Sequence, residues 1–415
     1  MNESNQTQQP QTQSAAPQET RQTDASQSQP EQQPQQYQQA QFQPPASQQS
    51  QFQQPQPQPQ SYYGQYPQQP VRPYYSAPQQ PAPMPVMMDP RQAWRVWRRR
   101  VVNRAAGLTF AYEGMMFAGA IVVTVFVGTA LNTGNIVVQY DGILSLVSVL
   151  LAFGFLLLMR HRDILTREFW LGGPHLDTYG EPNQLGRVSQ YGGGRMQPLW
   201  FLVFIILGMG TQGAVTLVQM GFSALGVDLA SPTSESIVES SVTVSMWLYV
   251  GLIGPICEEV MFRGVLMKEL KPLGKNFAIV TSALMFGLFH DDVVQGTFAF
   301  LFGLILGFVA MEYSLVWSIA LHIFNNAILS GVIDTLFAGH LSDNGYMAYS
   351  IALTLIGVIG AITVFVRYGR GLRQYSRTNH SIPDTYYGWT SPAFITFVVF
   401  NAAFAIFSFV TAMMG

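Results

Sequence analysis

The sequence predicts an all-α fold: a polytopic bundle of about eight or nine transmembrane helices, preceded by a disordered Gln/Pro-rich tail. Charged residues make up only 11% of the 415 residues and apolar residues 48%, a balance that points to a bilayer. The first ninety residues are almost entirely polar, so the rest is far more apolar than the average. We expect a tail at 1–90, a basic collar at 91–107 and a transmembrane helical domain at 108–415.

The tail is dominated by Gln, Pro and Ser. Such a tract has too little apolar surface to offset the entropy lost on ordering, so it is expected to stay disordered. Its expected role is that of a tether or an interaction arm.

The collar carries six arginines between 91 and 104, interleaved with Trp94 and Trp97. Arginine clusters favour the cytoplasmic side of a membrane, and tryptophan rings sit well at the headgroup level. The collar is therefore interpreted as a membrane-interface anchor, with the bilayer as partner and no nucleic acid. A multi-pass protein of the plasma membrane with a cytoplasmic N-terminus is expected.

Apolar stretches long enough to cross a bilayer, which needs about 20 residues, follow the collar. Lysines and arginines cluster near 160–195, 268–275 and 367–377. Placing these clusters in the cytoplasm gives an N-in, C-out topology that alternates through every span. The predicted spans are 108–130, 143–159, 198–223, 242–262, 277–295, 297–311, 315–335, 347–366 and 392–414.

Ionisable side chains gather in the central third of the chain, inside or at the ends of apolar spans. They are Glu258, Glu259, Arg263, His290 and His322. Because such groups are costly in a bilayer, each is a functional candidate. The alternative is a buried ion-pair network that only holds helices together.

The first of three clusters runs from Glu258 to Arg263. On a helix, Glu259 and Arg263 are i,i+4 partners that can close a salt bridge. Glu258 is rotated by about 100° from its neighbour and points elsewhere. Glu258 is therefore the better candidate for the working carboxylate.

The other two clusters each place two side chains on one helix face, Phe286 with His290 and His322 with Asn326. An imidazole and a carboxamide one turn apart can present two hydrogen-bond donors to one point, as an oxyanion site requires. Glu258 and His290 lie about equally far from the turn predicted near 272–275, which places them at one depth. His322 follows the next cytoplasmic turn, so all three clusters can converge in one cytoplasm-facing cavity.

The ordered triple Glu-Glu-x-x-x-Arg, Phe-x-x-x-His and His-x-x-x-Asn, with Phe262-Arg263-Gly264 closing the first motif, resembles the CPBP family of intramembrane proteases. This family includes the type II CAAX prenyl endopeptidases. The resemblance covers about residues 240–335, the expected catalytic core. It implies an endopeptidase that cleaves a membrane-associated or lipidated peptide or protein substrate.

The resemblance also implies roles for single residues. Glu258 and His290 would activate a water for attack on a peptide carbonyl, and His322 and Asn326 would stabilise the oxyanion. The supporting residues would be Glu259, Arg263 and Phe286.

A zinc site is the alternative to this metal-free mechanism, since two histidines and a glutamate can bind zinc with water in the fourth position. The HExxH pattern is absent, and Asn is a poor zinc ligand. No cofactor is therefore favoured.

Two neighbouring patterns have simpler interpretations. The pair Asp291-Asp292 could form a metal or substrate-amine site, but the end or break of a helix is favoured. Gly303 and Gly307 form a small-xxx-small pattern typical of helix packing.

Two other functions compete with the peptidase. One is a non-catalytic scaffold or bacteriocin self-immunity protein of the same fold, which the resemblance also includes; the intact Glu258, His290, His322 and Asn326 argue against it. The other is a proton-coupled transporter, which predicts repeats or broken helices in matching halves, and none is apparent.

Overall fold

The computed structural model describes residues 89–131, 136–172, 196–229, 231–232, 243–333, 340–381 and 384–414. This part of the chain contains helices and no strand, which confirms the all-α prediction. The predicted tail lies outside the described residues except for its last two positions.

The helices before the first motif and after the third are long. They are α1 (Pro90–Leu131), α2 (Ile136–Ile164), α4 (Pro198–Ser223), α13 (Asp343–Thr378) and α14 (Pro392–Met414), with the short α3 (Arg167–Leu171) and the 3-10 turn η8 (Thr385–Thr390) between them.

The central helices are shorter, and several contain π turns. Between Val244 and Leu273 the chain runs through α6 (Val244–Leu248), η3 (Tyr249–Ile253), α7 (Gly254–Glu259), η4 (Val260–Leu266), α8 (Met267–Leu270) and η5 (Lys271–Leu273). It continues through α9 (Lys275–Leu288), α10 (Val293–Glu312), α11 (Leu315–Ile323) and η6 (Phe324–Ile333).

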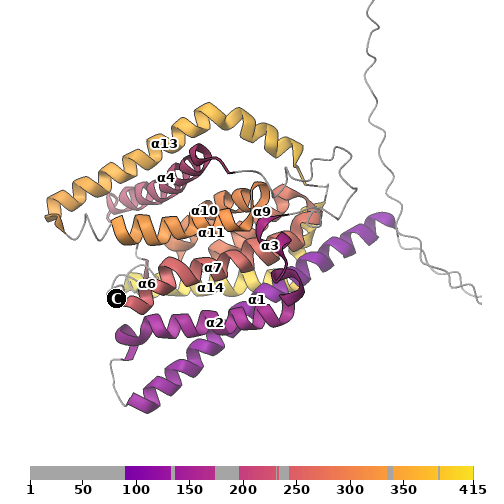
Figure 1. Ribbon diagram of the computed structural model, residues 1–415, viewed down its shortest axis with the longest axis horizontal. Helices are drawn as coiled ribbons and strands as arrows, with labels where there is room; N and C mark the ends of the chain where they lie inside the picture. The colour runs from indigo at the N-terminus through magenta and orange to yellow at the C-terminus, as the bar shows by residue number, and fades with distance from the viewer. Residues whose placement is uncertain are drawn as a thin grey trace, which may run out of the picture. The chain divides into compact units, whose positions relative to one another are not determined.

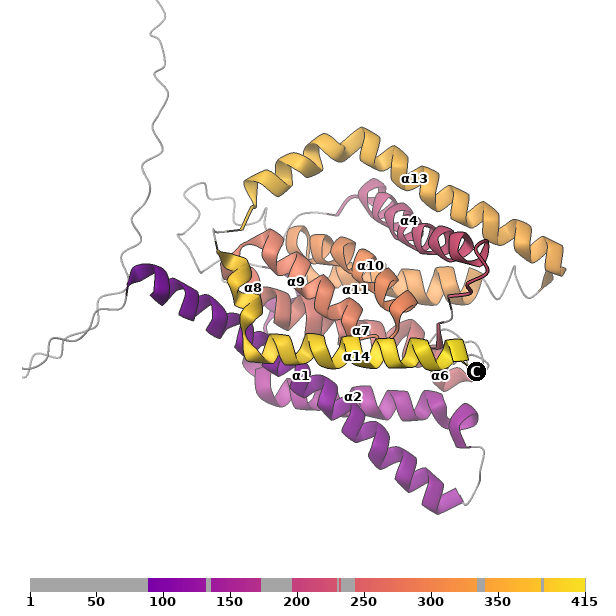
Figure 2. The ribbon, with the colours of Figure 1, turned by 180° about the vertical axis from the view of Figure 1, so that it is seen from behind.

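The long helices flank the central ones (Figures 1 and 2). Helices α9 and α10 form a packed hairpin, and α10 also contacts α11 and α4. On one side α4 packs along α13, and on the other α1 packs against α2 and α14. The chemistry-bearing motifs therefore lie in the middle of the bundle.

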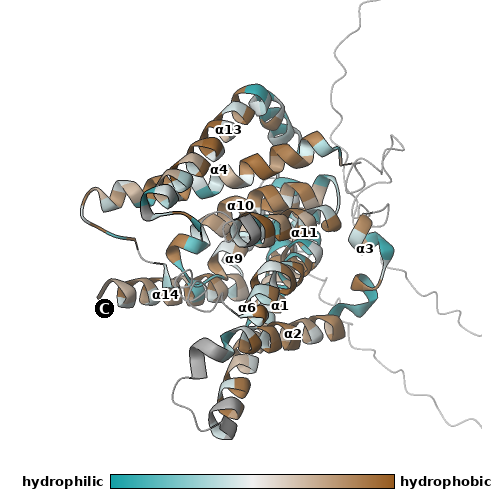
Figure 3. Ribbon diagram, turned by 60° about the vertical axis from the view of Figure 1, so that its left-hand side comes forward, coloured by the Kyte–Doolittle hydropathy of each residue, from teal (hydrophilic) through white to brown (hydrophobic). Residues whose placement is uncertain are grey.

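The outer surfaces of the long helices are apolar (Figure 3). Within the described residues, six helices are long and apolar enough to cross a membrane, and 275–288 and 315–331 are shorter apolar helices. Large apolar side chains point outward on different helices, among them Phe126 (70% exposed), Leu158 (78%) and Val366 (81%). Such surface is expected where helices face lipid rather than water.

Over the residues that the structure describes, each of the nine predicted spans falls mainly on helices, but some boundaries differ. The collar is helical, because α1 begins at Pro90 and continues into the first span. Residues 367–377 likewise continue α13. Arginine is a good helix former, and its long stem lets the guanidinium reach water while the backbone stays hydrogen-bonded.

The end of the predicted span 277–295 was wrong, since α9 ends at Leu288. Asp291 adopts a left-handed backbone (φ 52°), and the Asp292 carboxylate accepts hydrogen bonds from the backbone N–H groups of Val294 and Gln295, both at 2.8 Å. An acidic N-cap satisfies the free N–H groups that begin a helix. The interpretation of Asp291-Asp292 as a helix break is confirmed.

Glycines allow α10 to lie close to α9. A Cβ on Gly303 would come within 3.3 Å of Ala283 Cα, and one on Gly307 within 3.1 Å of Ile279 Cγ2. The packing role predicted for these two glycines is confirmed.

Ion pairs join the helices at one end of the bundle. Glu269 on α8 binds Arg104 of α1 (2.9 Å) and Arg160 of α2. Glu312 at the end of α10 binds Lys275 of α9 at 2.8 Å and accepts a hydrogen bond from the Tyr375 hydroxyl of α13 (2.6 Å). The positive clusters at this end are the basis on which a cytoplasmic location is predicted for it.

Candidate active site

The adjacent carboxylates Glu258 and Glu259 end helix α7, immediately before the π turns of η4. Successive helical residues diverge by about 100°, so the two side chains enter different surroundings. Glu259 is fully buried, whereas the Glu258 side chain is 17% exposed and lines a cavity.

Glu259 is the centre of a closed polar network. Arg263 Nη1 donates to Glu259 Oε1 at 2.7 Å, which confirms the predicted salt bridge. Ser318 Oγ donates to the other carboxylate oxygen, Oε2. His322 Nδ1 lies 3.1 Å from Oε1, and Arg263 also donates to the Gly303 carbonyl at 3.4 Å. A buried charge needs such partners to offset its desolvation.

His322 connects the two carboxylates. Its Nδ1 donates to Glu259, because an ionised carboxylate can only accept. The other ring nitrogen, Nε2, lies 3.8 Å from Glu258 Oε2. The imidazole is therefore oriented by the buried network and presents Nε2 to the cavity that Glu258 lines.

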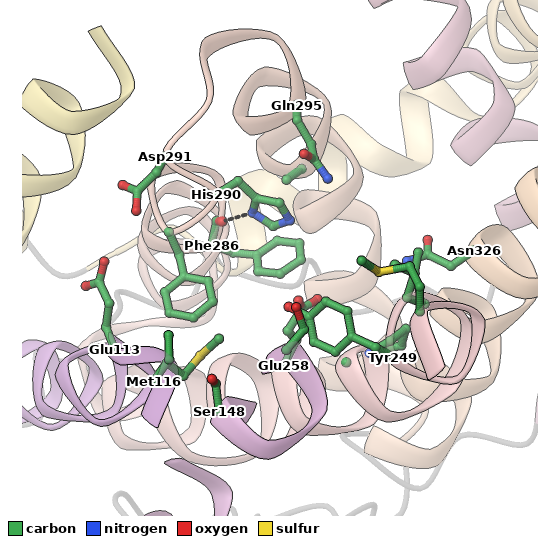
Figure 4. Close-up of a pocket in the computed structure, with 18 of the residues that line it drawn as sticks. Glu113, Met116, Ser148, Tyr249, Glu258, Phe286, His290, Asp291, Gln295 and Asn326 are labelled. Atoms are coloured by element: carbon green, nitrogen blue, oxygen red, sulfur yellow. Dashed lines mark hydrogen bonds between the residues drawn. The ribbon is translucent and has the colours of Figure 1, made fainter. Parts of the chain in front are cut away.

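His290 lies in the turn after α9 and is oriented by the last turn of that helix. Its Nδ1 lies 2.8 Å from the carbonyl oxygen of Phe286, the contact drawn as a dashed line in Figure 4. A carbonyl accepts only, so Nδ1 carries the proton and Nε2 of the neutral ring is left as an acceptor. That is the form in which an imidazole can take a proton from water.

The Phe286 ring is packed among the charged and aromatic groups of the site. Its centroid lies 4.8 Å from that of His290 and 5.9 Å from that of His322, both edge to face. The Arg263 guanidinium lies 4.1 Å above the same ring, a distance at which the cation is attracted to the ring face. Phe286 thus fixes both imidazoles through its ring and its carbonyl.

Asn326 lies on η6, where the helix has changed from α to π turns. Its Nδ2 donates to the Val250 carbonyl at 3.2 Å, and its Oδ1 accepts from Asn325 Nδ2 at 3.0 Å. An amide NH₂ has two protons, so one donor remains beyond the Val250 contact. π turns occur frequently at functional sites.

One cavity of about 560 Å³ brings the predicted residues together. Glu258, His290, His322 and Asn326 all line it, as does Phe286, and Figure 4 shows its wall. Glu259 and Arg263 lie behind the wall in the closed network. The volume is in the range of ligand-binding cavities, about 300–1,000 Å³.

The described side chains do not form a zinc site. Among these residues no three His, Cys, Asp or Glu side chains are grouped so that they could hold a metal ion. A catalytic zinc needs three protein ligands around one point. The arrangement does not fit the metal, and metal independence stays a prediction.

Two polar residues of the site were not predicted from the sequence. Glu113 of α1 lines the cavity and is 3% exposed, and its Oε2 accepts from Asn401 Nδ2 of α14 at 3.3 Å. Glu113 lies inside a predicted span, so the rule applied to Glu258 should have found it. Ser318 carried no such signal, because a serine in an apolar helix is common.

Residues 240–328 match the family model described as type II CAAX prenyl endopeptidase Rce1-like. The matched segment contains all three motifs and ends shortly after Asn326. Neither the curated proteins nor the solved structures give a match. The match confirms, over residues 240–328, the resemblance to the CAAX protease family that the three motifs predicted.

Proposed function

We propose that this protein is an intramembrane endopeptidase that hydrolyses a peptide bond in a membrane-associated or lipidated substrate. The observation that carries the proposal is the convergence of Glu258, His290, His322 and Asn326 on one cavity inside an apolar bundle. The Rce1-like match over 240–328 supports a membrane protease of the CAAX type.

In the proposed reaction a water molecule lies between Glu258 and His290. Glu258 takes a proton as the water oxygen attacks the substrate carbonyl carbon, and Nε2 of His290 accepts a hydrogen bond from the same water. The Phe286 carbonyl keeps the proton on Nδ1, so that Nε2 remains an acceptor. The Glu258 proton then passes to the leaving amine as the C–N bond breaks.

Attack produces a tetrahedral oxyanion that must be stabilised. The second N–H of Asn326 is one donor. His322 supplies another when both its nitrogens are protonated, since the imidazolium can donate to Glu259 through Nδ1 and to the oxyanion through Nε2. Donors held in place before the reaction stabilise the developing charge without reorganisation.

Glu259, Arg263, Ser318 and Phe286 are positioning residues in this proposal. They do not touch the substrate, but they fix the orientation of the two imidazoles. Contacts of this kind, made from behind the reacting groups, hold them in a productive geometry.

The proposed setting is the plasma membrane, with the N-terminus in the cytoplasm. The collar arginines and the ion-paired end of the bundle support this orientation. The partners proposed are the bilayer and a peptide or protein substrate within it.

The test is cleavage of a quenched membrane-peptide library by the purified full-length protein in lipid. Wild type is compared with Glu258→Ala and His290→Ala, each with and without a chelator. Asp163→Asn is the matched control, because Asp163 is an exposed carboxylate at the ion-paired end of the bundle. We expect activity in wild type and control, loss in both site variants, and no effect of the chelator.

The other outcomes separate the alternatives. Loss of wild-type activity on chelation, restored by zinc, would replace the metal-free mechanism with a metal-dependent one. Absence of cleavage by folded wild-type protein would overturn the peptidase and favour a non-catalytic scaffold or self-immunity protein.

A further inference from the structure

The cavity has a second group of carboxylates that the proposed hydrolysis does not use. Glu113 comes from α1, and Asp291 from the turn between α9 and α10; both line the cavity. Figure 4 shows their carboxylates on the same side of the site, away from Asn326. A helix and a turn that are distant in sequence thus bring acidic groups to one part of the cavity wall.

These carboxylates carry buried oxygens that lack donors. Glu113 is only 3% exposed. Its Oε2 accepts a hydrogen bond from Asn401, but its Oε1 has no hydrogen-bond partner among the described residues. Asp291 Oδ1 is buried and without a partner in the same sense, and so is Gln295 Oε1 beside His290. Unsatisfied buried acceptors are costly, so donors from a bound molecule would be stabilising there.

Acidic groups outnumber basic ones on the cavity wall. Its lining includes the carboxylates of Glu113, Asp141, Glu258 and Asp291 and two histidines, and it contains no lysine or arginine. Arg263 is close by but is engaged with Glu259 behind the wall. A pocket with an excess of one sign of charge in an apolar surrounding attracts the opposite charge.

The backbone at Asp291 supports a role for its side chain. Its φ of 52° lies in the left-handed region that few residues other than glycine adopt. Asp tolerates this conformation at a cost, and residues held in it cluster at functional sites. Asp292 alone caps α10, so the helix start does not require the carboxylate of Asp291.

Glu113 also lies at the depth of Glu258. The ion pair between Arg104 and Glu269 sets a common level for α1 and α8. Counting from it at about 1.5 Å per residue, Glu113 lies about 14 Å along α1 and Glu258 about 16 Å along the segment that ends in α8. A group bound at Glu113 is therefore level with the carboxylate proposed to activate water.

We propose that Glu113 and Asp291 form a subsite for a basic side chain, Lys or Arg, of the substrate peptide near the bond that is cleaved. The inference rests on the proposed function, since it names the chemistry of the same substrate. A metal ion is the less suitable occupant, because no three acidic, His or Cys side chains are grouped to hold one among the described residues. Ammonium and guanidinium groups instead donate several hydrogen bonds to carboxylates.

The experiment uses fluorescent membrane peptides in which one Lys is moved along the sequence, each paired with the same peptide carrying norleucine. Binding to the full-length protein in lipid nanodiscs gives Kd, and cleavage of the same peptides gives kcat/KM. At one or two positions we expect Lys to bind at least about tenfold more tightly than norleucine, as a desolvated charge pair would provide.

Two conservative variants test the assignment. Glu113→Gln keeps the shape and a partner for Asn401, and Asp291→Asn keeps a residue that tolerates positive φ. Each is expected to reduce the preference for Lys to within about twofold, whereas the exposed Asp163→Asn control retains it. Either variant alone suffices if the other does not fold.

The outcomes distinguish the two proposals. Equal Kd for Lys and norleucine at every position, or a preference that survives both variants, overturns the subsite whether or not cleavage occurs. A Lys preference that depends on Glu113 or Asp291 supports the subsite, and if no peptide is cleaved it does so while overturning the peptidase.

Discussion

The polar network around Glu259 and the cavity in front of Glu258 occupy two faces of the same helix, α7. In the network each carboxylate oxygen meets donors from other helices, and the side chain is fully buried. In the cavity Glu258 is partly exposed, and the ion-pair contact described for it is His322 Nε2 at 3.8 Å. Two identical side chains, adjacent in sequence, thus have opposite surroundings.

This difference gives the two carboxylates different roles: Glu259 positions neighbouring side chains, and Glu258 takes part in the proposed reaction. A fully buried carboxylate with both its oxygens engaged cannot reach a substrate, but it can fix an imidazole and an arginine. A carboxylate with open lone pairs beside a cavity can take a proton. Four variants test this division of roles, in order of decreasing expected effect on activity.

The largest effect is expected on activity from Glu258→Gln. Loss of the proton acceptor should lower kcat/KM on a cleaved peptide by about 10²–10⁴-fold, the usual contribution of a general base. The midpoint of thermal unfolding in detergent should stay near that of wild type, because Gln has the same shape and the site is partly open. Unchanged kcat/KM would contradict the role of Glu258.

Glu259→Gln should act on stability as well as activity. It leaves the fully buried Arg263 without its carboxylate, which costs about 3–5 kcal/mol in free energy of unfolding. The double variant Glu259→Leu/Arg263→Met removes both charges and should recover much of this stability without recovering activity, since His322 has lost its Nδ1 partner. Recovery of activity in the double variant would show that the network does not position His322.

Much of the fold was predictable because span length and charge clusters depend on local composition. The end of α9 was not, since the predicted span continued through His290. The acidic pair Asp291-Asp292 was the visible sign of the break, and the N-cap at Asp292 gives its cause. Nothing in the apolar pattern predicted the π turns around Glu259 and Asn326.

The site was predictable in part for a similar reason. The pairing of Glu259 with Arg263 follows from helical spacing, which the sequence displays directly. The contact from Ser318 to Glu259 joins residues on different helices, and no spacing rule reaches across the bundle. Glu113 was visible as an acid in an apolar span, but its partner Asn401 lies 288 positions further along the chain.

Ser318→Ala should have a smaller effect than either glutamate variant. Ser318 Oγ lies within hydrogen-bond distance of Glu259 and of the Leu306 carbonyl. It has one proton, and the charged carboxylate is the stronger acceptor for it. Loss of this donor should cost about 1–3 kcal/mol, because Glu259 keeps Arg263 and His322. Ser330→Ala, on the exposed side of η6, is the control and should stay within about 0.5 kcal/mol of wild type by chemical denaturation. Equal values for the two serines would remove Ser318 from the network.

The smallest effect on activity is expected for Lys268, which instead affects the pH dependence of stability. Lys268 is a partly buried cation five residues after Arg263 and outside the membrane-spanning segments. Its ammonium donates to the Phe169 carbonyl and lies 4.1 Å from the Phe169 ring. Burial, aided by nearby Lys271, lowers the pKa of Lys268 from 10.5 to about 7. Arg263 differs in having a carboxylate at 2.7 Å. Lys268 therefore shows what burying a cation costs without such a close ion pair.

The direction in which pH changes the stability follows from proton binding. Between pH 7 and 10 the unfolded chain binds the Lys268 proton and the folded protein does not, so the free energy of unfolding rises with pH over this window. Below pH 7 both states are protonated and the contribution is constant. The midpoint of heat denaturation is measured for wild type and Lys268→Met in detergent from pH 6 to 9.5. The wild-type midpoint should rise relative to that of the variant as the pH rises. Parallel profiles would mean that the Phe169 contacts compensate the buried charge as fully as Glu259 compensates Arg263.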